Sequence, residues 1–131
     1  MAKALGKNLF LTFIISSVLT FLAIRIYYSK EAGSLEGNQG IFIMILASLF
    51  WILILSILSL TVFLNLHDKV RKNLLLSILT FYLLPLIATI LFYCTSEIKD
   101  MWGSFFILTG FYFFIQTCFF IKFRKIDLKT L

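Results

Sequence analysis

An uncharged segment from Ile41 to Leu66 constrains the fold of this chain more than any other feature of its sequence. The segment contains no proline and no acidic or basic residue. As an α-helix, with a rise of about 1.5 Å per residue, it would extend about 39 Å and exceed the hydrocarbon thickness of a bilayer, about 30 Å. A soluble domain hides such a helix only at the centre of a large core, and 131 residues are too few to build one. The segment therefore predicts a transmembrane helix.

Three further apolar runs have a similar length. The four runs predict transmembrane helices at about residues 8–28, 41–66, 73–94 and 102–122. Hydrophobic residues make up 61% of the chain and charged residues 14%, against about 25% charged in ordinary soluble domains, so we expect one membrane domain over residues 1–131. The last two links are short, which makes consecutive helices antiparallel neighbours. The expected fold is an all-α, integral membrane four-helix bundle with up-down-up-down topology.

A basic start followed by an apolar run is also typical of a signal peptide. No cleavage site of small residues follows Ile24, and the chain continues with an arginine and two tyrosines. A guanidinium group can reach the lipid headgroups, and aromatic rings favour the membrane boundary. Both kinds of side chain anchor the end of a transmembrane helix. We therefore expect the first run to be retained as a helix. Interfacial anchors are predicted at Arg25, Tyr27, Tyr28, Trp102, Lys122 and Arg124.

The net charge of +6 is placed at the ends of the apolar runs. It forms no patch interleaved with exposed aromatic residues, so we expect the lipid bilayer, and not nucleic acid, as its partner. Three of the twelve basic residues flank one side of the bundle (Arg25, Lys30 and Lys99) and nine flank the other. The positive-inside rule then predicts that both termini are cytoplasmic, and the compact chain without a signal peptide favours a bacterial inner membrane. The nine are Lys3, Lys7, Lys69, Arg71, Lys72, Lys122, Arg124, Lys125 and Lys129.

Small and polar residues recur on one face of each predicted helix. In lipid, helices associate through close packing at small residues and through interhelical hydrogen bonds, so these faces are candidates for packing or for partner binding. The simplest use is a common axis inside the bundle. In the alternative, the last helix uses its small residues to dock another protein. The candidates are Thr12, Ser16 and Thr20 in the first helix, Ser48 and Ser59 in the second, and Gly103, Gly110 and Thr117 in the fourth.

Gln116 is the most polar side chain well inside a predicted span. An unpaired amide in hydrocarbon costs several kcal/mol, so this side chain should face protein. We expect an interhelical hydrogen bond, with Tyr82 or a serine as the partner. A contact with a substrate is the alternative.

Residues for catalysis or ion coupling are missing from the predicted spans. No Asp or Glu lies within any of them, whereas a cation-coupled carrier usually keeps an acid near the middle of the membrane. Small multidrug transporters are similar in length and helix count, but their family signature includes a glutamate in the first helix that this chain lacks. Neither paired aspartates nor an HExxH motif is present, and Cys94 and Cys118 are expected to be free thiols. We expect no catalytic residues, metal or cofactor.

Two functional hypotheses follow. In the first, the chain acts by helix–helix interaction with another membrane protein or with copies of itself, as an accessory subunit or an immunity-type protein. Immunity proteins against pore-forming toxins are similar in size and layout. In the second, the chain is a small oligomeric carrier or channel for a lipid-like or neutral solute. A lipid-modifying enzyme is a third and weaker alternative, because no reactive set of residues is visible.

Overall fold

The computed structural model describes residues 2–30, 33–95 and 102–130, with the side chains of residues 105–125 in the last range. The prediction of an all-α fold with four long apolar helices is confirmed. Four helical stretches, at residues 2–27, 35–66, 74–95 and 105–125, are long and apolar enough to cross a membrane. The elements are α1 (Ala2–Tyr27), α2 (Leu35–Leu58), the 3₁₀-helix η1 (Ser59–Leu66), α3 (Asp68–Lys72), α4 (Leu74–Thr95) and α5 (Trp102–Thr130).

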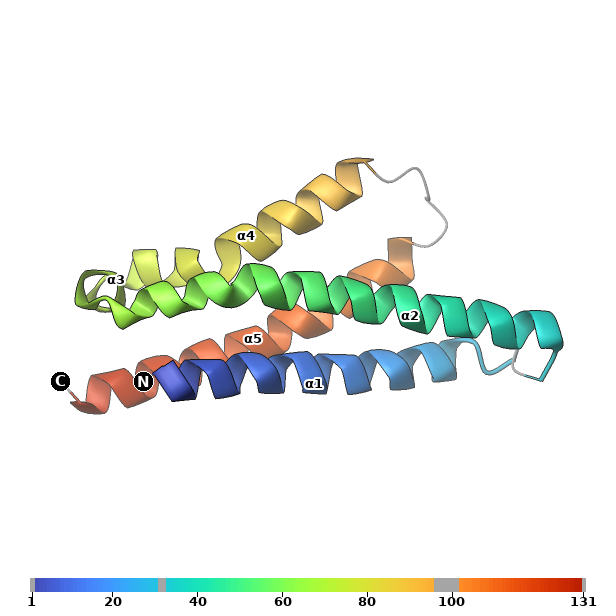
Figure 1. Cartoon of the computed structure of the whole chain (residues 1–131), viewed down its shortest axis with the longest axis horizontal. Helices are drawn as coiled ribbons and strands as arrows, with labels where there is room; N and C mark the ends of the chain where they lie inside the picture. Colours follow the sequence, from blue (N-terminus) through green and yellow to red (C-terminus); the bar gives the residue numbers. More distant parts are fainter. Residues whose placement is uncertain (1, 31–32, 96–101, 131) are drawn as a thin grey trace.

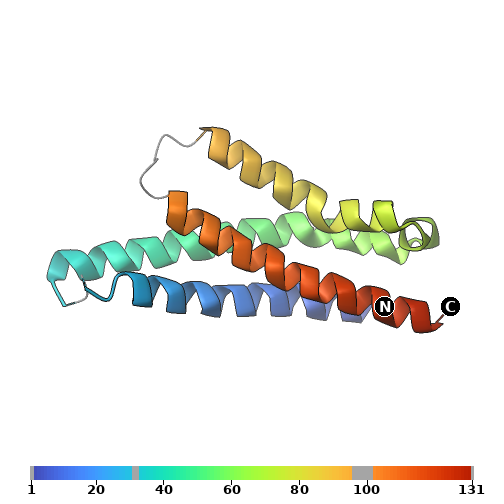
Figure 2. The same ribbon diagram turned by 180° about the vertical axis from the view of Figure 1, so that it is seen from behind.

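The helices form an elongated bundle in which α1 packs against both α2 and α5, and α4 packs mainly against η1 (Figures 1 and 2). The short helix α3 lies at the same end of the molecule as both chain termini. From this end α4 runs away from α2, so that its far end stands apart in both views. Aromatic side chains connect α2 with α4 and α5 in this region. The ring centroid of Trp51 lies 4.7 Å from that of Phe92 and 5.0 Å from that of Phe105.

Several helices extend beyond the predicted boundaries. α1 already begins at Ala2, and α5 continues to Thr130 through residues predicted to form a tail. Both extensions are free of Gly and Pro apart from Gly6, and Lys and Arg are good helix formers. Basic residues near a helix C-terminus also interact favourably with the helix dipole. At the other end, α2 begins early because the side chain of Ser34 caps it, accepting a hydrogen bond of 2.9 Å from the Gly37 amide.

The second apolar run changes its helical type near its end. The α-helix stops at Leu58 and η1 continues to Leu66, so the prediction of one α-helix is wrong for the last eight residues. A 3₁₀-helix has 3.0 residues per turn, so residues three apart lie in line. In η1 the aligned residues are Ser59, Val62 and Asn65, and all three are buried. In an α-helix each of these residues would be rotated by about 60° around the helix axis relative to the one before it. The 3₁₀ geometry therefore brings all three to the interior.

The apolar core has two layers along the bundle. Near the end that carries α3, each of α1, η1, α4 and α5 contributes one side chain. Further along, α2 and α5 supply a second layer, against which Phe13, Ala88 and Phe105 pack. The first layer consists of Leu5, Val62, Phe81 and Phe123, and the second of Trp51, Ile52, Leu55 and Tyr112.

Candidate functional site

A proline in α4 and a glutamine in α5 form the centre of the polar interior. Pro85 has no amide hydrogen and leaves the carbonyl of Phe81, four residues earlier, without its helical partner. The amide nitrogen Nε2 of Gln116 donates a hydrogen bond of 2.6 Å to this carbonyl. Gln116 is 3% exposed, so the bond lies in an environment from which solvent is excluded. A neighbouring helix thus satisfies the acceptor that the proline frees.

The same glutamine links α5 to the start of η1. Its Nε2 donates a second hydrogen bond of 3.2 Å to Oγ of Ser59, and this hydroxyl lies 2.8 Å from the hydroxyl of Tyr112. Ser59 and Tyr112 are fully buried. On the next turns toward the far end of the bundle, Nε1 of Trp51 donates to Oγ1 of Thr109 over 3.3 Å. These bonds fix the rotation of α5 against α2 and η1.

A second polar cluster joins η1 to α4 around the buried Asn65. The Asn65 amide donates 2.6 Å to Oγ1 of Thr80 and 3.0 Å to the carbonyl of Val62. Its carbonyl oxygen accepts a hydrogen bond of 2.7 Å from Oγ of Ser77. Thr61 of η1 donates 2.7 Å to the backbone carbonyl of Thr80. Asn65 therefore uses both amide hydrogens and its oxygen within the protein.

The polar side chains predicted in α1 and α2 are buried. Thr12 and Ser48 are 2% and 5% exposed, and each hydroxyl donates to the carbonyl one turn earlier in its own helix. Ser16 and Thr20 are fully buried, but their hydroxyls have no hydrogen-bond partner among the described residues. The predicted candidate Ser59 belongs to the cluster around Gln116.

Two of the small residues predicted in α5, Gly110 and Thr117, lie outside the bundle, where the simplest expectation placed them inside. Gly110 is exposed, and a Cβ atom built there would meet nothing within 4 Å. Thr117 is also exposed, although its hydroxyl accepts a hydrogen bond of 2.9 Å from Tyr82. α5 faces inward through Leu108, Tyr112, Ile115 and Gln116. The other three lie three or four residues from Tyr112, so the four share one helical face, and Gly110 is turned away from it. The side-chain surroundings of Trp102 and Gly103 lie outside the described residues.

The predicted anchors divide between the two ends of the bundle. Arg25 and Tyr27 are exposed and Tyr28 is half-buried, with the two tyrosine rings 4.9 Å apart. At the end with the chain termini, Lys122 is exposed, but Arg124 contacts the protein.

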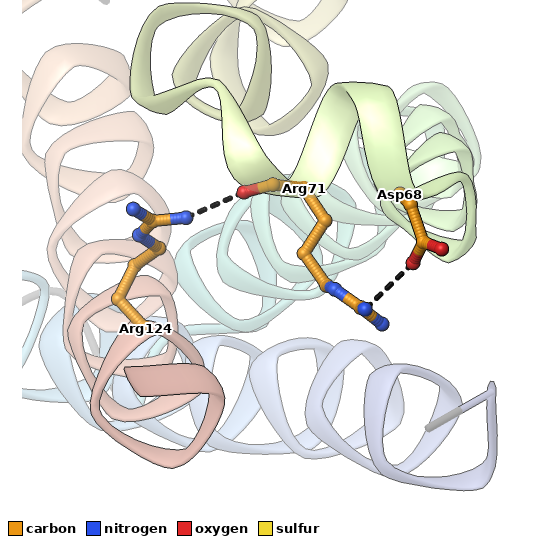
Figure 3. Close-up of polar contacts among 3 residues, drawn as sticks. All are labelled: Asp68, Arg71 and Arg124. Atoms are coloured by element: carbon orange, nitrogen blue, oxygen red, sulfur yellow. Dashed lines mark hydrogen bonds and ion pairs between the residues drawn. The ribbon is translucent and has the colours of Figure 1, made fainter. Parts of the chain in front are cut away.

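Arg124 connects α5 to α3. Its Nη1 donates 2.7 Å to the carbonyl of Arg71, whose own guanidinium lies 2.6 Å from the carboxylate of Asp68 (Figure 3). α3 is a single short helix, so its last carbonyls have no partner within the helix. The guanidinium of Arg124 therefore caps α3 and ties it to α5.

The polar groups of the described interior are mostly neutral. Apart from tyrosine, the buried polar side chains among the described residues are Ser, Thr, Asn and Gln, which do not titrate near neutral pH. Within the same residues, no three His, Cys, Asp or Glu side chains gather as a metal site would require. Both cysteines are exposed and unpaired. The neutral hydrogen bonds of the described interior hold the helices in register.

Sequence reasoning missed several members of this interior, namely Asn65, Thr109, Tyr112 and Trp51. Asn65 had the same signal as Gln116, an amide inside an uncharged run, and could have been found by it.

Comparisons with protein-family models, curated proteins and solved structures found no match.

Proposed function

We propose that the chain is an integral membrane protein whose helices cross a bacterial inner membrane up-down-up-down, with both termini in the cytoplasm. Large apolar side chains on the outside of the bundle support insertion: Ile26 is 74% exposed, Phe114 69% and Leu75 66%. The basic start of α1, the basic helix α3 and the basic end of α5 lie at one end of the molecule, which supports the orientation (Figure 1).

Within the membrane, we propose that the protein acts by binding a helix of another membrane protein, as an accessory subunit or an immunity-type protein, without catalysis. The observation that carries this proposal is that the donors of the two buried side-chain amides, Gln116 and Asn65, bond to acceptors within the protein. Tyr112, whose hydroxyl bonds to the same Ser59 as Gln116, and Leu55, which packs in the same apolar layer as Tyr112, are both 0% exposed. A carrier would need such polar groups to line a path for its solute.

The outer face of α5 offers the surface on which such a partner would dock. Gly110 has open space above its backbone, and it is flanked on the same face by Ile107 and Phe114, which are 55% and 69% exposed. A residue without a side chain lets the backbone of a second helix approach closely, which strengthens van der Waals packing in lipid. The partner in this proposal is an apolar transmembrane helix.

Site-specific crosslinking tests this proposal. A photoreactive amino acid replaces Phe114 on the outer face of α5 and, as the matched control, Phe42 on α2, which is 65% exposed. Irradiated cells should give a discrete adduct at position 114 alone, and mass spectrometry identifies the crosslinked protein. Gly110→Leu should remove the adduct, because the added side chain fills the space above α5.

Three results would count against the proposal. Adducts of equal yield at both positions would mean random contact in the membrane. An adduct with a second copy of the chain would replace a foreign partner by a homo-oligomer. Uptake of a neutral solute by liposomes that contain only the purified chain would favour a carrier instead.

A further inference from the structure

An apolar groove of about 330 Å³ runs between α1 and the α2–η1 segment and is open to the outside of the bundle. The groove lies toward the end that carries the chain termini, since its lining begins at Gly6, close to the N-terminus. The α1 wall continues to Phe13, seven residues further on, which corresponds to about 10 Å along the helix axis. The main lining residues are Gly6, Phe10, Phe13, Ile57, Leu60 and Phe63.

Gly6 leaves the end of this groove nearest the termini unfilled. A Cβ atom at this position would lie 3.7 Å from Cζ of Phe63, an ordinary van der Waals distance. The residue is helical and has no positive φ, so the backbone does not require glycine here. A Cβ atom at this position would therefore fit in ordinary contact with Phe63, and a longer side chain would extend into the groove that Gly6 lines.

Two lysines of α1 lie close in sequence to Gly6, although neither lines the groove itself. Lys3 and Lys7 are exposed and stand one turn before Gly6 and directly after it. Lys3 precedes Phe10 by two helical turns and Lys7 precedes it by three residues, so both ammonium groups belong to the face of α1 that carries Phe10. Phe10 is 64% exposed. This face therefore combines positive charge at the end of the bundle with apolar surface toward its middle.

The acidic side chain described at this end is already engaged. Asp68 pairs with Arg71, and this is the ion pair that the described residues contain (Figure 3). Lys3 and Lys7 lie on a different helix, and neither forms an ion pair with any acid of the described part of the chain. Among the described residues, therefore, no acid pairs with these two lysines.

We propose that this groove binds one anionic phospholipid, with its phosphate at Lys3 and Lys7 and an acyl chain along the wall from Gly6 to Phe13. This occupant combines an anionic group with an apolar chain, since the face of α1 that carries the groove residue Phe10 also carries the two lysines. A partner helix would fill the groove but leave the lysines without an anion. The inference rests on the membrane insertion proposed above, which places this end in the cytoplasmic leaflet, where anionic lipids attract basic residues.

Native mass spectrometry of the purified full-length chain, titrated with phosphatidylglycerol or phosphatidylcholine, tests the charge requirement. Lys3→Gln/Lys7→Gln should weaken retention of phosphatidylglycerol by about fivefold for each lysine. The matched control, Lys122→Gln/Lys125→Gln, removes the same charge from the same end but on α5, and should change retention less than about twofold. Equal losses in the two double variants would mean diffuse attraction to the basic end and would overturn a site in the groove.

A second pair of variants tests the groove independently of charge. Gly6→Leu should occupy the acyl-chain path and reduce phosphatidylglycerol retention, whereas Gly40→Leu adds the same side chain where nothing lies within 4 Å. Unchanged retention in Gly6→Leu would overturn the proposal. So would a photocrosslink from Phe10 to a protein helix in native membranes.

The outcome also separates this inference from the proposed insertion. A chain that fails to co-float with liposomes after reconstitution contradicts membrane insertion itself. A chain that inserts, yet retains both lipids equally, overturns only the lipid site.

Discussion

Gln116 and Phe81 are joined by a hydrogen bond of 2.6 Å that links two helices through a side-chain amide and a backbone carbonyl. The carbonyl is available because Pro85 cannot donate to it. A proline in one helix and a glutamine in the next are therefore parts of a single arrangement. In hydrocarbon neither the Phe81 carbonyl nor the Gln116 amide can bond to water instead. The effect of Pro85 and of Gln116 on the stability of the fold therefore depends on the presence of the other.

This dependence predicts a specific result in a double-mutant cycle. Gln116→Leu keeps a similar side-chain volume but leaves the Phe81 carbonyl without a donor, and should lower the free energy of unfolding by about 1 to 2 kcal/mol. In the Pro85→Ala background the new amide of residue 85 can donate to this carbonyl, so the same change should cost less. Reversible unfolding in mixed micelles measures both differences. Equal costs in the two backgrounds would disconnect the glutamine from the proline.

Asn65 should be the most sensitive polar residue of η1. Asn65→Leu removes the acceptor of the Ser77 hydroxyl and a donor to Thr80, both of which remain in the interior. We expect the free energy of unfolding to fall by about 1 to 3 kcal/mol, since buried polar groups lose their partners. The matched control is Asn38→Leu, at an exposed position of α2. A change in Asn65→Leu no larger than in this control would contradict a structural role for the cluster.

The hydroxyls of Ser16 and Thr20 should have the opposite effect on stability from the Asn65 amide. Both are fully buried, and neither has a partner within the described chain, so each lowers the stability of the packed state. Ser16→Ala and Thr20→Val should leave the free energy of unfolding unchanged or raise it by up to about 1 kcal/mol. Thr12→Val is the comparison, because the Thr12 hydroxyl is bonded to the Asn8 carbonyl. A clear loss of stability in both variants would reveal a partner such as a buried water molecule.

The helices themselves could be predicted because length and hydropathy act locally. Each apolar run is long enough to span a bilayer. The helices extend six residues further at the start of α1, six at the start of α2 and eight at the end of α5, where a cap or good helix formers allow it. The conversion of residues 59–66 to a 3₁₀-helix could not be predicted. It depends on tertiary contacts that pull Ser59 and Asn65 to one face, and the local sequence of this segment resembles any apolar α-helix.

The polar interior could be predicted only in part from the sequence. The polarity of Gln116 made an interhelical bond necessary, and a serine, Ser59, is one of its two acceptors, as expected. The other acceptor is the backbone carbonyl of Phe81, which could not be predicted because the proline one helix away makes it available. The direction in which α5 turns its glycine could not be derived either. Gly110 and Tyr112 lie on different faces of one helix, and sequence alone does not say which face packs inside, because in lipid both small and large apolar residues are acceptable outside.

Cysteine labelling tests the orientation on which the functional proposals depend. Cys94 and Cys118 are first replaced by serine, and Glu36→Cys and Lys69→Cys are made separately at exposed positions near opposite ends of α2 and η1. These positions flank one predicted span, so a membrane-impermeant maleimide should reach only one of them in intact cells. Because the basic residues gather at the end with α3, we expect labelling at position 36 in intact cells and at position 69 only after permeabilisation. Labelling of both positions in intact cells would exclude a membrane between them, and labelling of position 69 alone would reverse the orientation and place the lysines of α1 in the outer leaflet.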